Sequence, residues 1–65
     1  MKIHSAAIIH PKAEIGKDVE IGPFSVIGEH VKIDNGNIIE NNVTITGNTT
    51  IANNNVIFPN AVIGS

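Results

Sequence analysis

Several residue types are scarce or missing in this 65-residue chain, and each absence excludes a class of structure or function. Cysteine is absent, so no disulfide can staple the chain and no thiolate can bind a metal ion. Charge is sparse, with four basic and six acidic residues, and the net charge of −2 argues against electrostatic binding of nucleic acid. No apolar run approaches the roughly 18 residues of a membrane helix. The N-terminus has no apolar signal-peptide segment, so we expect a cytoplasmic protein.

Isoleucine recurs at every sixth position along the whole chain. It stands at positions 3, 9, 15, 21, 27, 33, 39, 45, 51, 57 and 63, without insertion or gap. On an α-helix, six residues turn by about 600°, so successive isoleucines would point in three directions and form no stripe. In a β-strand the side-chain period is two, so all of them can share one face if each hexad is a short strand and a turn. The period therefore predicts β-structure and excludes a helix.

The other positions of the repeat agree with this interpretation. Four residues after each Ile stands a small or β-branched residue in eight of ten cases, the exceptions being Asn37 and Asn55. Gly, Pro and Asn concentrate in the positions directly after each Ile, where the chain must bend. We therefore expect about four residues of strand and a two-residue corner in each hexad.

Two architectures are compatible with many short strands. A flat antiparallel meander has some support, because Asn35-Gly36 is a typical hairpin turn. A meander, however, does not require one large residue per hexad on one face. A parallel solenoid does, because each inward residue stacks on its equivalent in the next coil. The repeat favours the solenoid.

The chain resembles the hexapeptide-repeat proteins, in which an aliphatic residue is often followed by Gly and, four positions on, by a small residue. This resemblance implies a left-handed parallel β-helix with three hexads per coil, hence about three coils for residues 1–65, without any helix. The implied inward stacks include Ile15, Ile33 and Ile51. Handedness follows from the resemblance alone, because ordinary crossovers are right-handed.

Within that superfamily, three stretches are similar to the N-terminal coils of UDP-N-acetylglucosamine acyltransferases. They are Ile8–Ala13, Val19–Phe24 and Asn55–Gly64. The resemblance implies acyl carrier protein and UDP-N-acetylglucosamine as partners of a full-length enzyme of lipid A biosynthesis, a homotrimer, and no cofactor. The family's substrate loop and catalytic His come later than Ser65, so no catalytic, cofactor-binding or metal-binding residue is predicted within residues 1–65.

The positions of the histidines and carboxylates do not predict a metal or catalytic site. His4, His10 and His30 lie in columns that do not converge on one metal ion, and no serine or carboxylate is placed to orient any of them as a base. Glu14, Asp18 and Glu20 belong to outward or corner columns, which indicates a solvated charged surface. Asn42 and Asn60 are expected as corner residues. Asn37 and Asn55, eighteen residues apart, are expected to face inward and to bond to each other.

We therefore expect residues 1–65 to be a single β-helix segment, the N-terminal part of a longer β-helix domain that acts as scaffold. The segment alone is expected to lack acyltransferase activity and to associate through its C-terminal end. Two alternatives stay open. One is another hexapeptide acyltransferase, either a glucosamine N-acyltransferase or a CoA-dependent acetyltransferase. The other is a stand-alone β-helix without catalytic function.

Overall fold

The computed structural model describes residues 1–64 and contains only β-strands and turns. Eleven strands of two residues each follow one another at six-residue intervals. They are β1 (Lys2–Ile3), β2 (Ile8–Ile9), β3 (Glu14–Ile15), β4 (Glu20–Ile21), β5 (Val26–Ile27), β6 (Lys32–Ile33), β7 (Ile38–Ile39), β8 (Thr44–Ile45), β9 (Thr50–Ile51), β10 (Val56–Ile57) and β11 (Val62–Ile63). The all-β prediction is confirmed. The strands are shorter than the four residues expected, because the corners take up the rest of each hexad. Among residues 1–64 no helix is long and apolar enough to cross a membrane.

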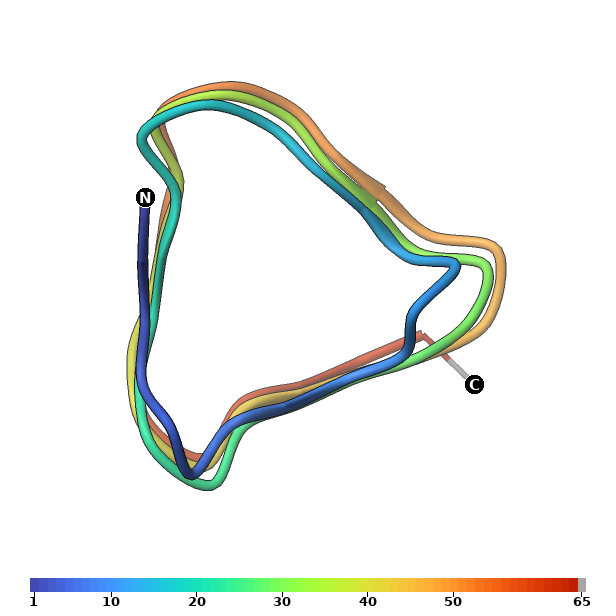
Figure 1. Ribbon diagram of the computed structural model, residues 1–65. Helices are drawn as coiled ribbons and strands as arrows, with labels where there is room; N and C mark the ends of the chain where they lie inside the picture. The colour runs from blue at the N-terminus through green and yellow to red at the C-terminus, as the bar shows by residue number, and fades with distance from the viewer. Residues whose placement is uncertain (65) are drawn as a thin grey trace.

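The strands form three parallel sheets around a triangular coil (Figure 1). Sheet A has the order β1-β4-β7-β10, sheet B the order β11-β8-β5-β2, and sheet C the order β3-β6-β9. Partners are eighteen residues apart, as in Lys2 with Glu20, so one coil contains three hexads. In Figure 1 the chain starts at the end near the viewer and runs counterclockwise as it recedes, which makes the coil left-handed. The left-handed β-helix of about three coils is thus confirmed.

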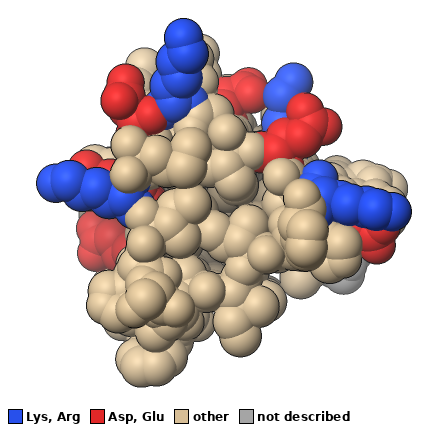
Figure 2. Space-filling view, in the orientation of Figure 1, with Lys and Arg blue, Asp and Glu red and all other residues tan. Residues whose placement is uncertain are grey.

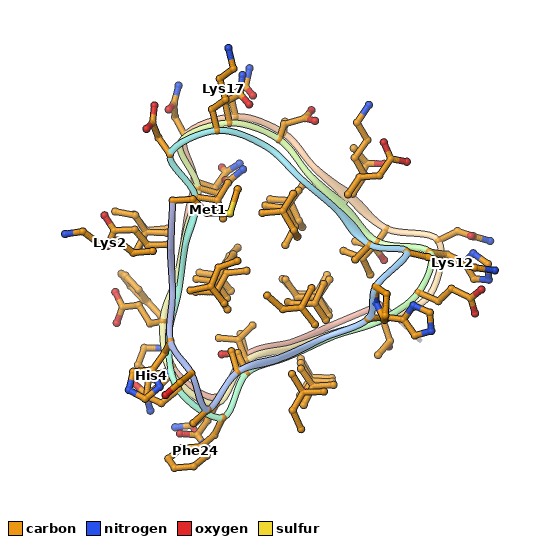
Figure 3. The ribbon with its side chains drawn as sticks, in the orientation of Figure 1. Met1, Lys2, His4, Lys12, Lys17 and Phe24 are labelled. Atoms are coloured by element: carbon orange, nitrogen blue, oxygen red, sulfur yellow. The ribbon has the colours of Figure 1, made fainter. Side chains whose placement is uncertain are left out.

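Repeat isoleucines fill the interior of the triangle (Figure 3). Their inward stacking follows from the register, since Ile33 lies between Ile15 and Ile51 in sheet C, as predicted. The fully buried core belongs to the middle coils: Val19, Ile21, Ile27, Val31, Ile33, Ile39, Val43 and Ile45. Isoleucines of the first and last described coils are less buried, Ile3 being 41% exposed. The middle coils therefore supply most of the apolar burial that stabilises the fold.

The corners depend on residues that adopt positive φ. In five hexads this is the third residue after the repeat Ile: Asp18, Phe24, Asn42, Asn54 and Asn60 have φ between 56° and 67°. Asn and Asp tolerate this left-handed conformation better than other side chains. The corner role predicted for Asn42 and Asn60 is therefore confirmed.

Asparagine side chains also bond between coils. The Asn35 Oδ1 atom accepts a hydrogen bond from the Lys17 backbone N–H at 2.8 Å, and the Asn53 Oδ1 atom accepts one from the Asn35 N–H at 2.9 Å. Inside the prism, the Asn37 Oδ1 atom accepts from the Asn55 N–H at 2.7 Å. Asn37 is fully buried, whereas Asn55 is exposed, so the expected inward pair is confirmed for Asn37 alone. The bond runs from backbone to side chain and not between the two amides.

Candidate functional site

The outer sides of the three sheets differ in chemistry. The outward residue of each strand is the one before the repeat Ile. Sheet A presents Lys2, Glu20, Ile38 and Val56; sheet B presents Ile8, Val26, Thr44 and Val62; sheet C presents Glu14, Lys32 and Thr50. A ligand or partner of this segment can bind to one of these surfaces, to a corner or to an end of the prism, because side chains fill the interior of the middle coils.

The three histidines lie at separate points of two corners. His4 lies beside Phe24 in the corner between sheets A and B (Figure 3), and His10 and His30 lie between sheets B and C. The His4 Nδ1 atom accepts a hydrogen bond from the Ala6 N–H at 3.0 Å, and the His10 Nδ1 atom accepts one from the Lys12 N–H at 3.1 Å. These bonds hold the rings against the corner backbone. The His4 and His10 side chains therefore have a local structural role in the corners.

No metal centre is formed by the acidic and imidazole groups of residues 1–64, where no three such side chains gather. His30 is 3.9 Å from the Glu29 carboxylate, and the Lys12 ammonium is 3.6 Å from the same carboxylate. All three side chains are substantially exposed, and exposed ion pairs of this kind contribute little to stability. Glu14, Asp18 and Glu20 are likewise exposed, as predicted for a solvated surface.

One open groove lies over the outer side of sheet A and the adjoining corner. Its volume is about 820 Å³. Charged and imidazole side chains from Lys2, His4, Glu20 and Glu40 line it together with the apolar Phe24 and Ile38. General base catalysis requires an imidazole that a second group orients. Within residues 1–64 no ion pair joins His4 to a carboxylate, and the His4 Nδ1 atom is bonded to the Ala6 N–H.

Two of the buried side chains are polar, Ser25 and Asn37, and both are fully hydrogen-bonded. The Ser25 hydroxyl donates to the Glu40 carbonyl at 2.8 Å and accepts from the Val43 N–H at 3.1 Å. Asn37 bonds to Asp34, Ala52 and Asn55 through both atoms of its amide. Among the described residues, no buried side-chain nitrogen or oxygen lacks a partner. These groups join neighbouring coils and are not open to a ligand.

Comparison with known proteins connects this scaffold to a class of enzyme. Residues 12–47 match the family model described as bacterial transferase hexapeptide (six repeats). The whole chain is similar to a crystal structure of UDP-N-acetylglucosamine acyltransferase, with 55% identity and a TM-score of 0.98. The chain covers 100% of its own length in that match and 25% of the acyltransferase chain. A comparison with curated proteins found no match.

Proposed function

Because this chain belongs to the bacterial hexapeptide transferase family, we propose that it forms the N-terminal coils of a UDP-N-acetylglucosamine acyltransferase of lipid A biosynthesis. The observation that carries the proposal is the similarity of all its residues to that enzyme at 55% identity. Because this chain spans a quarter of the acyltransferase, activity belongs to the proposed longer protein. Acyl carrier protein and UDP-N-acetylglucosamine would be its partners, the cytoplasm its location, and a homotrimer its assembly.

The role assigned to residues 1–65 in this proposal is that of a scaffold. The groups that could have served chemistry are engaged elsewhere: His4 and His10 accept backbone hydrogen bonds, and Glu29 lies beside Lys12. The buried polar residues Ser25 and Asn37 bond across coils. What the segment contributes is a rigid prism with an eighteen-residue register, which fixes the orientation of any coil stacked upon it.

A chimera tests this role. The aligned coils of the similar acyltransferase are replaced by residues 1–65, and transfer of a hydroxyacyl chain from acyl carrier protein to UDP-N-acetylglucosamine is measured. We expect turnover within about tenfold of the parent enzyme, because no reacting group changes. A control chimera lacks residues 29–34, one complete hexad. It keeps the repeat but rotates all preceding coils by one side of the triangle, so we expect it to be much less active.

Two results would overturn the proposal. The first is turnover by the isolated 65-residue chain, because a scaffold has no reacting groups. The second is a chimera that assembles with the mass of the parent enzyme and retains its β-sheet circular dichroism, yet has no more activity than the hexad-deleted control.

A further inference from the structure

The dipeptide Asn35-Gly36 is the only Asn-Gly pair in the sequence, and the structure places it in a corner of the prism. It lies between β6 and β7, where the chain passes from sheet C to sheet A. Gly36 has a φ of +72°, in the left-handed region that glycine adopts without strain. The dipeptide that favours a hairpin in other sequences therefore serves here as a bend between two parallel sheets.

An Asn-Gly sequence can also modify itself without an enzyme. The backbone nitrogen of the glycine attacks the Cγ atom of the asparagine side chain and closes a succinimide ring. The bond from Cγ to Nδ2 breaks, and Nδ2 leaves as ammonia with the proton of the glycine N–H. Water then opens the ring, its hydroxyl going to Cγ to give aspartate or to the backbone carbonyl carbon to give isoaspartate, and its proton going to the nitrogen. Glycine hinders the attack least, because it has no Cβ.

In the folded chain the preceding coil holds both reacting groups of this pair. The Gly36 N–H, which must give up its proton, donates to the Lys17 carbonyl at 2.9 Å. The Asn35 Oδ1 atom accepts from the Lys17 N–H at 2.8 Å, which directs the side chain toward the neighbouring coil. Ring closure needs a free nitrogen and a Cγ atom within bonding distance of it. The two bonds to the Lys17 backbone oppose both requirements.

The following coil holds the same dipeptide from its other side. The Asn35 N–H donates to the Asn53 Oδ1 atom at 2.9 Å, and the Asn35 carbonyl accepts from the Asn54 N–H at 3.0 Å. Asn35 and Lys17 are nevertheless exposed. Figure 2 shows lysine and carboxylate side chains at the top of the molecule, where Figure 3 places Lys17 and this corner. Water reaches the corner, so its protection comes from hydrogen bonds between coils and not from burial.

We propose that Asn35-Gly36 is a self-modification site that the stacked coils keep unreactive, and that it deamidates when the corner opens. Local opening of this kind breaks the bonds to both neighbouring coils. Isoaspartate at position 35 routes the backbone through its Cβ atom and lengthens it between β6 and β7. The extra atom shifts the register that places Ile39 between Ile21 and Ile57. A chain that has opened is thus marked by a change that prevents the corner from closing again.

The first experiment compares the folded chain with the same chain in guanidinium chloride. Both are incubated in mildly alkaline buffer, and a protease that cleaves after glutamate releases the peptide from His30 to Glu40. Mass spectrometry follows the replacement of the amide by a carboxyl group, and fragmentation separates Asn35 from Asn37. We expect deamidation at Asn35 to be slower in the folded chain on the order of thirtyfold, since at least two hydrogen bonds must break.

A matched pair of variants tests whether the corner bonds give the protection. Asn53 and Asn41 are both exposed and both stand two positions after a repeat Ile. The Asn53 side chain bonds to Asn35, whereas the Asn41 side chain bonds to Asn42 in the corner between sheets A and B. In variants whose circular dichroism shows β-sheet, we expect Asn53→Ala to raise the rate at Asn35 about fivefold and Asn41→Ala to leave it unchanged.

Asn35→Asp separates the effect of the new charge from that of the longer backbone. Its carboxylate can still accept from the Lys17 N–H, so this variant should refold, whereas the purified isoaspartyl chain should recover less β-sheet signal. Equal rates in the folded and unfolded chains, or an Asn53→Ala rate equal to that of the wild type, would overturn the protection. An unfolded chain that stays unmodified at Asn35 would overturn the site itself. An isoaspartyl chain that refolds like Asn35→Asp would overturn the marking of opened chains.

Discussion

Replacement of Asn37 by Val should destabilise the fold although it places an apolar residue in an apolar core. Val19, Val31 and Val43 are buried in other hexads at the same repeat position, so shape alone predicts tolerance. Asn37, however, makes three hydrogen bonds. Its Nδ2 group donates to the Asp34 carbonyl at 2.9 Å and to the Ala52 carbonyl at 2.7 Å, and its Oδ1 atom accepts from the Asn55 N–H at 2.7 Å.

The magnitude follows from which groups lose their partners. The Ala52 carbonyl keeps a bond from the Asn55 side chain at 2.9 Å, but the bonds that Asn37 makes to the Asp34 carbonyl and the Asn55 N–H are lost. Each lost bond costs about 1 kcal/mol, and more where a group is left buried without a partner, so we expect a loss of roughly 2–4 kcal/mol. A domain of this length has a stability of roughly 3–10 kcal/mol, so the variant should be close to unfolding.

The free energy of unfolding is measured by circular dichroism in urea, at one protein concentration because association also stabilises the folded state. Asn55→Val is the matched control. It changes the equivalent residue one coil later, where the side chain is exposed and donates to Ala52 and Asn53 at 2.9 and 3.4 Å. We expect it to cost less than about 1 kcal/mol. If Asn37→Val were no more destabilising than Asn55→Val, the buried amide would not hold the coils together and the argument would be refuted.

Two further predictions concern the register and the corners. Ile33→Asp should unfold the chain, because Ile33 is 1% exposed and a carboxylate there would have no partner. Lys32→Asp, on the outer side of the same strand, should change the free energy of unfolding by less than about 0.5 kcal/mol. Equal effects of the two variants in thermal unfolding would mean that the inward and outward positions are wrongly assigned. Gly36→Ala should cost roughly 1–2 kcal/mol, because Gly36 has φ of +72° and an added Cβ would collide with the Asn54 side chain. Gly28→Ala is the control, since the nearest atom to an added Cβ at Gly28 is 3.4 Å away. A urea midpoint for Gly36→Ala as high as that of Gly28→Ala would contradict the corner geometry.

Periodicity could predict most of the coil but not its hand. A six-residue period with one invariant Ile fixes which residues face inward, and Ile33 lies between Ile15 and Ile51 as the pattern required. Nothing in that pattern separates a left-handed from a right-handed coil, and the general preference of crossovers points the wrong way. The left hand came from resemblance to the hexapeptide-repeat proteins. The strands have two residues and not four, although the backbone hydrogen bonds between coils include the flanking residues, as from the Lys2 N–H to the Val19 carbonyl and from the His4 N–H to the Ile21 carbonyl, both at 2.9 Å.

The surface could be predicted only after the number of hexads per coil was known. At six-residue intervals along the sequence, the outward position is a mixture of Lys, Glu, Thr, Val and Ile. At eighteen-residue intervals, which correspond to one coil, the same residues separate into three rows, and the row from Ile8 to Val62 has no charged residue. The positive φ of Phe24 could not be predicted in this way. The same corner position holds Asp, Asn, Gly, His, Lys or Ala in other hexads, and the residue type does not specify φ. The stacking that buries the isoleucines thus also arranges the outward residues in rows, so a repeat with an invariant inner face can still have three outer sides of different chemistry.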